Sequence, residues 1–175
     1  MHLIYLEAAA MYLVWTVALL LLRGKARRLA GVVGAVLSLG VILTATVFNR
    51  GAGNIEEINL VPFHTLAAAR SQRELYRSSF LNMALFLPLG LSLPHALPEK
   101  LRHKALVTAA AAAGLSVAIE AVQYFFRLGY CETDDVIMNT LGALVGSTSF
   151  LLISAISKAV KKKSSPSGTG KNRRD

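Results

Sequence analysis

The sequence has little charge for its length, and this scarcity excludes an ordinary soluble domain. Of its 175 residues, 17% are Asp, Glu, Lys or Arg and 54% are hydrophobic. Soluble domains average about 25% charged and about 45–50% apolar residues. Basic residues are missing altogether before Arg23. Long apolar stretches separated by short charged segments are typical of membrane spans.

Cysteine and acidic residues are also scarce. Cys131 is the only cysteine, so the chain can form neither an internal disulfide nor a cluster of cysteine ligands around a metal. It has 10 Asp and Glu against 19 Lys and Arg, which gives a formal net charge of +9. Nucleic-acid-binding proteins share such an excess, but they carry it on a soluble fold. We therefore predict no nucleic acid partner and interpret the basic residues as flanks of membrane spans.

Five apolar runs approach the roughly 20 residues that a spanning helix needs. They cover residues 3–22, 29–48, 80–97, 105–125 and 136–156. The third run is the shortest, and Pro88 and Pro94 interrupt it. We predict an all-α integral membrane protein with a bundle of about five transmembrane helices in residues 1–157. A basic, disordered cytoplasmic tail is predicted for residues 158–175.

The basic residues also predict an orientation. With five spans, the loops after the first and third runs and the tail lie on one side, and they hold most of the Lys and Arg residues. Basic loops stay in the cytoplasm, so the N-terminus is expected outside and the C-terminus inside. A four-span alternative, with a re-entrant third run, would split these segments across the membrane. Residues 64–77 are expected outside, as an amphipathic surface helix or a packed loop.

Few polar side chains lie within the spans, and the topology puts them in one layer near the outer face. A charged side chain at the bilayer centre costs roughly 2.5–3.5 kcal/mol on insertion scales, so such groups normally face protein or water. The layer comprises Glu7, Thr44, Thr46, Asn82, Glu120, Gln123 and Asn139.

Spacing groups these side chains on helix faces. Ser116, Glu120 and Gln123 recur at the interval of one helix face. A second such set contains two glycines that allow another helix to approach closely. That set is Asp135, Asn139, Gly142 and Gly146.

These faces predict an outward-facing polar pocket. We expect Glu120 and Asn139 to face each other below the loop between their helices. That loop carries Arg127, Glu132, Asp134 and Asp135. Structural alternatives stay open, because Asp134 could cap the last helix and Asn139 could join helices for about 0.6–2 kcal/mol.

Four short motifs occur in an order and spacing that resemble the VanZ-like family of bacterial membrane proteins. They start at Asn59, Asn82, Glu120 and Asp134. The matching positions are Asn59, Pro62, Phe63, Asn82, Phe86, Pro88, Gly90, Glu120, Gln123, Asp134, Asp135, Asn139 and Gly142. The resemblance implies a small multi-helix protein of the bacterial plasma membrane. The family's name-giving member is associated with low-level resistance to the glycopeptide teicoplanin, and the resemblance implies neither catalytic residues nor a cofactor.

Three functions stay open at this point. In the first, the pocket of a non-enzymatic protein binds a membrane lipid, a cell-wall precursor or another lipid-linked ligand and alters glycopeptide susceptibility. Its candidate residues are Asn59, His64, Asn82, Glu120, Gln123, Arg127, Asp134, Asp135 and Asn139.

The second function is an intramembrane enzyme acting on a lipid-linked substrate. Glu120 could be a general base or could join His64, Asp134 and Asp135 around a divalent cation, and Arg127 could hold a phosphate. No nucleophile or metal motif supports this function, so we assign no catalytic residue and no metal site. The third function, a transporter or channel subunit, lacks a visible inverted repeat.

Overall fold

The computed structural model describes residues 2–49, 58–64, 67, 73–129 and 131–163. Its long helices are α1 (His2–Leu21), α2 (Gly24–Leu43), α4 (Arg73–Ala96), α5 (Lys104–Phe125) and α6 (Thr133–Lys163). The shorter elements are a π-helix, η1 (Thr44–Phe48), that continues α2, and two strands, β1 (Ile58–Asn59) and β2 (Cys131–Glu132). The predicted all-α fold with five helices is confirmed.

Within the part of the chain that the structure describes, four helices are long and apolar enough to cross a membrane. These spans are Gly24–Phe48, Arg77–Ala96, Lys104–Phe125 and Thr133–Val160. Large apolar side chains on their outer surfaces are exposed, including Leu106 and Leu152. Lipid tails are as apolar as leucine, so such surfaces suit a bilayer rather than water. The chain is therefore a multi-pass membrane protein.

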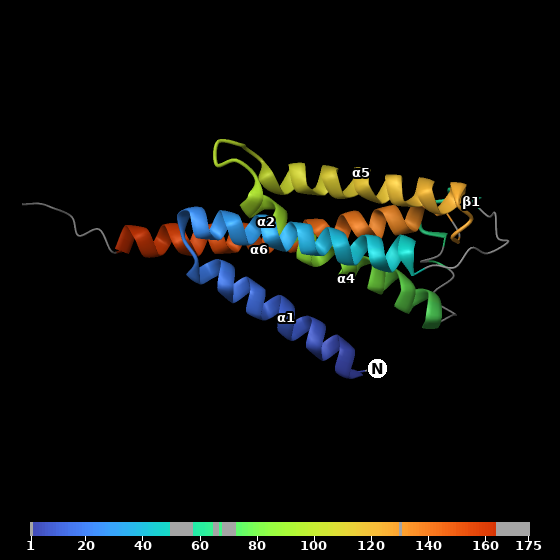
Figure 1. Cartoon of the computed structure of the whole chain (residues 1–175), viewed down its shortest axis with the longest axis horizontal. Coiled ribbons are helices and arrows are strands. Elements are labelled where there is room, and N and C mark those ends of the chain that lie inside the picture. The colour runs from blue at the N-terminus through green and yellow to red at the C-terminus, as the bar shows by residue number, and fades with distance from the viewer. Residues whose placement is uncertain (1, 50–57, 65–66, 68–72, 130, 164–175) are drawn as a thin grey trace, which may run out of the picture.

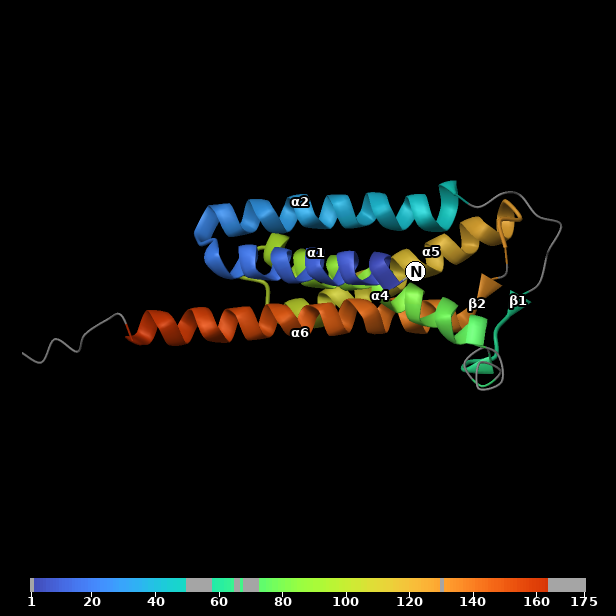
Figure 2. The same ribbon diagram turned by 90° about the horizontal axis from the view of Figure 1, so that it is seen from below.

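The helices run alternately up and down the bundle, and α6 lies alongside α4 and α5 (Figures 1 and 2). Helix α1 differs, because its N-terminal half diverges from the bundle (Figure 1). Its second half is attached by side chains: the Tyr12 hydroxyl lies 2.9 Å from Ser149 Oγ, and Trp15 Nε1 donates to Ser92 Oγ at 3.0 Å. Helix α1 has 20 residues, and those of its residues whose side chains are described, Tyr12–Leu21, form an apolar helical segment. The side chain of Glu7 lies outside the described residues.

Glycines set the close approach of α4 and α6. A Cβ atom on Gly90 would collide with the Ala143 carbonyl, and one on Gly142 would collide with the Met83 carbonyl. Gly146, one turn further along α6, meets the backbone of α4 in the same way. Only glycine fits at these three points, so the small-residue pair predicted from spacing packs α6 onto α4.

Helix α4 is continuous through Pro88 and Pro94. Proline has no N–H, so Pro94 leaves the Gly90 carbonyl without its usual helical donor. The hydroxyl of Ser147 on α6 donates chiefly to Ala143 O, at 2.8 Å, and lies 3.3 Å from Gly90 O, where it is a weaker shared donor. Neighbouring hydroxyls of this kind let spanning helices tolerate proline.

Several helices extend beyond the apolar runs that predicted them. α2 begins at Gly24 and α4 begins at Arg73, both earlier than expected, and α6 continues to Lys163. The additional residues include Lys, Arg and Glu, which are good helix formers and carry the helix past the apolar segment. The predicted tail at 158–175 is thus helical in its first part. Residues 164–175, and residues 65–66 and 68–72 of the surface helix predicted at 64–77, lie outside the described residues.

Candidate functional site

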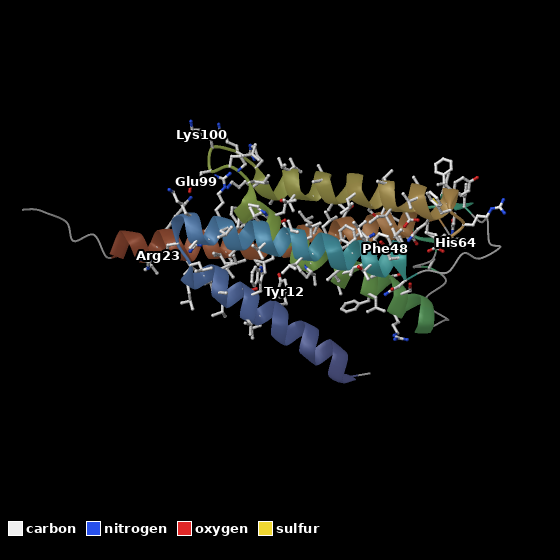
Figure 3. The ribbon with its side chains drawn as sticks, in the orientation of Figure 1. Tyr12, Arg23, Phe48, His64, Glu99 and Lys100 are labelled. Atoms are coloured by element: carbon white, nitrogen blue, oxygen red, sulfur yellow. The ribbon has the colours of Figure 1, made fainter. Side chains whose placement is uncertain are left out.

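The predicted site residues gather at one end of the bundle, here called the loop end. It consists of η1, β1, β2 and the turns at residues 60–64 and 126–129. Figure 3 shows Phe48 and His64 at this end, whereas Arg23, Glu99 and Lys100 lie at the opposite one. The opposite end, here called the basic end, consists of the connections 22–23 and 97–103 and the C-terminal part of α6.

The α5 face predicted from spacing is buried. Ser116 is 0%, Glu120 5% and Gln123 1% exposed. Gln123 Nε2 donates a 2.8 Å hydrogen bond to the Thr46 carbonyl in η1, so this amide joins α5 to the end of α2. Gln123 Oε1 has no hydrogen-bond partner within the part of the chain that the structure describes.

Asn139 of α6 points at the same α5 face and is 3% exposed. Its Nδ2 donates to Ser116 Oγ at 2.8 Å. Its direct partner is therefore Ser116, one helical turn from the Glu120 that we expected opposite it. Asn139 Oδ1, like the oxygen of Gln123, has no partner among the described residues.

Glu120 is directed toward β2 instead, and this explains the corrected pairing. Its Oε2 accepts a 3.0 Å hydrogen bond from the backbone N–H of Glu132. The neighbouring Cys131 thiol has a raised pKa, because burial and then the negative charge and hydrogen bonding of Glu120 disfavour the thiolate. Glu120 thus fixes the chain that leads into α6. The sequence pattern did not identify Cys131 or the Glu132 backbone as its partners.

Asp134 ties a distant loop to the start of α6. The carboxylate is buried in the first turn of that helix, where the helix dipole favours negative charge. Its Oδ1 accepts a hydrogen bond from the backbone N–H of Phe63. Phe63 has a φ of 63°, a left-handed conformation that costs a residue with a side chain roughly 1–2 kcal/mol. The carboxylate therefore holds a strained turn in place, beyond the helix-cap role considered from sequence.

The two strands reinforce this link. They pair in parallel, with Ile58 opposite Cys131 and Asn59 opposite Glu132. We call residues 58–64 with residues 131–134 the clip. The clip joins the connection before α4 to the connection before α6, at the end of the buried polar layer.

The remaining predicted residues lie around the layer. Asn59 Nδ2 lies 2.7 Å from His64 Nδ1, and Asn59 Oδ1 accepts from the Val61 N–H at 3.2 Å, so both side chains stabilise the exposed turn at Pro62. Arg127 is exposed. Asn82 on α4 and Asp135 on α6 are half-buried.

The polar groups at the loop end offer mainly hydrogen-bond acceptors to a ligand. The described residues contain no group of three or more His, Cys, Asp or Glu side chains that could hold a metal ion. The carboxylates of Glu120 and Asp134 accept backbone N–H groups. The oxygens of Gln123 and Asn139 are the buried acceptors that a ligand's hydroxyl, amide or ammonium group could use.

Comparison with known proteins connects this end of the bundle to a family. Residues 32–154 match the model of the VanZ/LLP1 family. Neither the curated proteins nor the solved structures compared with the chain gave a match. The matched residues run from α2 into α6 and contain every member of the polar layer except Glu7, because α1 lies before them. The chain therefore belongs to the VanZ/LLP1 family and is one of its multi-pass membrane proteins.

Proposed function

We propose that this chain is a non-enzymatic protein of the bacterial plasma membrane. Its loop end binds the polar part of a lipid or lipid-linked cell-wall component in the outer leaflet, and this binding lowers susceptibility to glycopeptides such as teicoplanin. The observation that carries the proposal is the pair of acceptors, Gln123 Oε1 and Asn139 Oδ1, which are buried without partners among the described residues. A buried polar atom without a partner costs roughly 1–3 kcal/mol. A donor on a ligand would recover that cost.

The charge distribution supports an outer location of the loop end. The basic end carries exposed cations on both of its connections, at the start of α2 and on α6. These are Arg23, Lys25, Arg28, Lys100, Arg102 and Lys158. Positively charged connections are retained in the cytoplasm, so the loop end faces the outer leaflet in this proposal.

The clip supports a ligand that lies in the membrane surface. It presents exposed apolar side chains at the same end of the bundle as the acceptors, and amphipathic segments of this kind rest at the boundary between headgroups and acyl chains. These side chains are Ile58, Leu60, Val61 and Phe63. Because the amide oxygens are covered in the described arrangement, we propose that the ligand reaches them when the clip moves.

The test uses a host in which the wild-type chain raises teicoplanin resistance. Asn139→Leu keeps the side-chain size and removes the acceptor, and we expect it to abolish the protection. Leu144→Ala is the matched control, because Leu144 lies on the exposed side of the same helix. Membrane abundance is measured by immunoblot, and native mass spectrometry measures the co-purifying lipid. Unchanged protection and unchanged lipid in Asn139→Leu at wild-type abundance would overturn the proposal.

An intramembrane enzyme is the second candidate, and the buried carboxylate of Glu120 beside the Cys131 thiol is the feature that favours it. However, Glu120 already accepts the Glu132 N–H. The raised pKa of Cys131 disfavours the thiolate that a nucleophile requires. These contacts support a positioning role. Turnover of undecaprenyl-linked or phospholipid substrates by purified protein, lost in Glu120→Gln, would establish the enzyme instead.

A further inference from the structure

The basic end contains a buried polar group that the proposed function does not use. His95 lies in the last turn of α4 and is 7% exposed. Its Nε2 has no hydrogen-bond partner in the residues that the structure describes. Its ring packs edge-on against Phe150 of α6, with 5.0 Å between ring centroids. Gly31 of α2 passes so close to it that a Cβ there would collide. The imidazole is thus held where three helices meet.

Two cations from different helices converge just beyond this imidazole. Lys104 Nζ of α5 donates to the Leu97 carbonyl at 3.0 Å, and Arg28 Nε of α2 lies 3.4 Å from the neighbouring Ala96 carbonyl. Lys104 also lies over the Phe150 ring that His95 contacts, 5.7 Å from its centroid. Residues far apart in sequence therefore place an ammonium and a guanidinium side by side at the end of α4.

Other charges nearby add to the positive potential. Arg27 donates to the carbonyls of Leu20 and Leu22 at the end of α1, and its charge reaches His95. The acidic neighbour is Glu99, which acts on Lys104. Cations at helix C-termini are favourable by themselves. Capping nevertheless uses only one of the N–H donors of Arg28 and one of those of Lys104 in the contacts described above.

We propose that Arg28, Lys104 and His95 bind the phosphate of an anionic phospholipid headgroup at the basic end. Phosphate oxygens accept hydrogen bonds from guanidinium and ammonium groups strongly, and a neutral imidazole can donate from Nε2. Lys104 and His95 share Phe150 as a neighbour, and the proposal requires the Lys104 side chain to move toward the phosphate and give it access to the imidazole. Basic sites between spanning helices are suited to anionic headgroups.

The apolar surroundings favour a lipid over free phosphate. Exposed aliphatic side chains continue from both cations along the outer surfaces of α2 and α5. They are Leu29, Val32, Val33, Leu106 and Val107. Acyl chains attached to the bound phosphate would lie against these side chains. This site is independent of the loop end, because it uses different residues at the opposite end of the bundle.

The experiment measures lipid binding to the purified full chain by native mass spectrometry and by thermal stabilisation in detergent. The probes are phosphatidylglycerol, phosphatidylcholine and inorganic phosphate. We expect phosphatidylglycerol to bind in preference to phosphatidylcholine, with no competition from inorganic phosphate. Arg28→Gln with Lys104→Gln should weaken phosphatidylglycerol binding roughly tenfold or more, since each cation near an anionic surface contributes severalfold.

The matched control is Lys100→Gln with Arg102→Gln, which removes the same charge from exposed side chains of the same end. It should weaken binding clearly less. An equal loss of phosphatidylglycerol binding in the two double variants would show that binding depends on diffuse surface charge. That result would overturn the proposed site. Competition by inorganic phosphate would identify a free-phosphate site instead of a lipid site.

His95 is tested by two variants that keep a packed side chain. His95→Phe removes Nε2 and should weaken phosphatidylglycerol binding, whereas His95→Gln retains a donor and should restore part of it. Gel filtration checks that both variants remain monodisperse. If both variants bind like the wild type, His95 is not part of the site.

Discussion

The loop end and the basic end bury polar groups of opposite kinds. At the loop end, the carboxylates of Glu120 and Asp134 accept backbone N–H groups near the start of α6. At the basic end, Arg27 and Lys104 donate to backbone carbonyls where α1 and α4 end. Helix dipoles favour the carboxylate of Asp134 at the start of α6 and the cations at the ends of α1 and α4. The bundle thus has an acceptor-rich end and a donor-rich end.

This difference suggests what each end can bind. Each end contains buried polar atoms without a partner in the described residues: amide oxygens at the loop end and His95 Nε2 at the basic end. The loop end suits a ligand that donates hydrogen bonds, and the basic end suits an anion. The family match at residues 32–154 contains the loop-end polar layer but excludes Arg27 and Arg28. The two ends therefore differ in how completely the family model covers them.

The largest expected effect comes from the close packing of α6 on α4, the two helices that connect the loop end with the basic end. Gly142→Ala would drive a Cβ into the Met83 carbonyl of α4. We expect a loss of about 3 kcal/mol or more, because backbone cannot move aside as a side chain can. Thermal unfolding in detergent measures the loss, and both ends should become labile together.

Gly114→Ala provides the control for this prediction. A Cβ on Gly114 meets nothing within 4 Å, and alanine is favoured over glycine within a helix by about 1 kcal/mol. We expect unchanged or slightly raised stability. If Gly142→Ala behaved like Gly114→Ala, the close packing of α4 on α6 would be wrong.

The second effect is confined to the loop end. Asp134→Ala removes the acceptor that holds Phe63 in its left-handed conformation. We expect a loss of about 1.5–3 kcal/mol, which is typical of a hydrogen bond to a charged group. Amide hydrogen exchange should accelerate in the clip and stay unchanged at the basic end. Asp134→Asn keeps an oxygen acceptor and should lose less. Equal acceleration at both ends would show that the ends are not independent.

The sequence predicted those features of the two ends that depend on local patterns of residues. Apolar runs located the helices, and the spacing of Ser116, Glu120 and Gln123 identified a face that is buried. The basic connections identified the segments that gather at one end of the bundle (Figure 3). Each of these signals depends on residues within a few helical turns of one another, so one sequence is sufficient to read them.

Local sequence patterns could not predict the contacts between residues far apart in the chain. The β1–β2 pair joins two strands of two residues each, which is too short for an alternating pattern. Asn139 reaches Ser116 on α5, and its position in the sequence alone could not distinguish this partner from Glu120, one helical turn away. His95 was missed because a single histidine in an apolar run carries no local signal for the cations that surround it.

The third prediction locks the clip with a disulfide and leaves the side chains of Gln123, Asn139 and the basic end unchanged. Ile58 lies directly opposite Cys131 in the parallel pair. Neighbouring strands are about 4.8 Å apart, within the range that a disulfide bridges. Ile58→Cys should therefore form a disulfide with Cys131 on oxidation, detected by mass spectrometry. If ligand access requires the clip to move, oxidation should abolish glycopeptide protection and reduction should restore it.

The matched control for the lock is oxidation of the wild-type chain, which has no second cysteine. Phosphatidylglycerol binding at the basic end should persist in the locked protein. Full protection by the locked protein would contradict movement of the clip while leaving the acceptors of Gln123 and Asn139 as a separate question.

The smallest expected effect is electrostatic. It tests whether the charge of Glu120 influences only groups at the loop end. The pKa of the Cys131 thiol is raised by burial first and by Glu120 next, so less thiolate is present at a given pH than for an exposed cysteine. Alkylation by a neutral maleimide should therefore be slow near pH 8 and accelerate as pH rises. Glu120→Gln removes the negative charge, lowers the thiol pKa and should speed alkylation by a factor of about 2–5, since thiolate is the reactive form.

Two further variants serve as controls for the alkylation measurement. Glu132→Gln should have a smaller effect than Glu120→Gln, because Glu132 is the weakest of the charges that raise the Cys131 pKa. Lys104→Gln, at the basic end, should leave the alkylation profile unchanged. A Lys104→Gln profile that moved as far as that of Glu120→Gln would mean that charge at one end acts across the bundle, and the division into two chemically separate ends would fail.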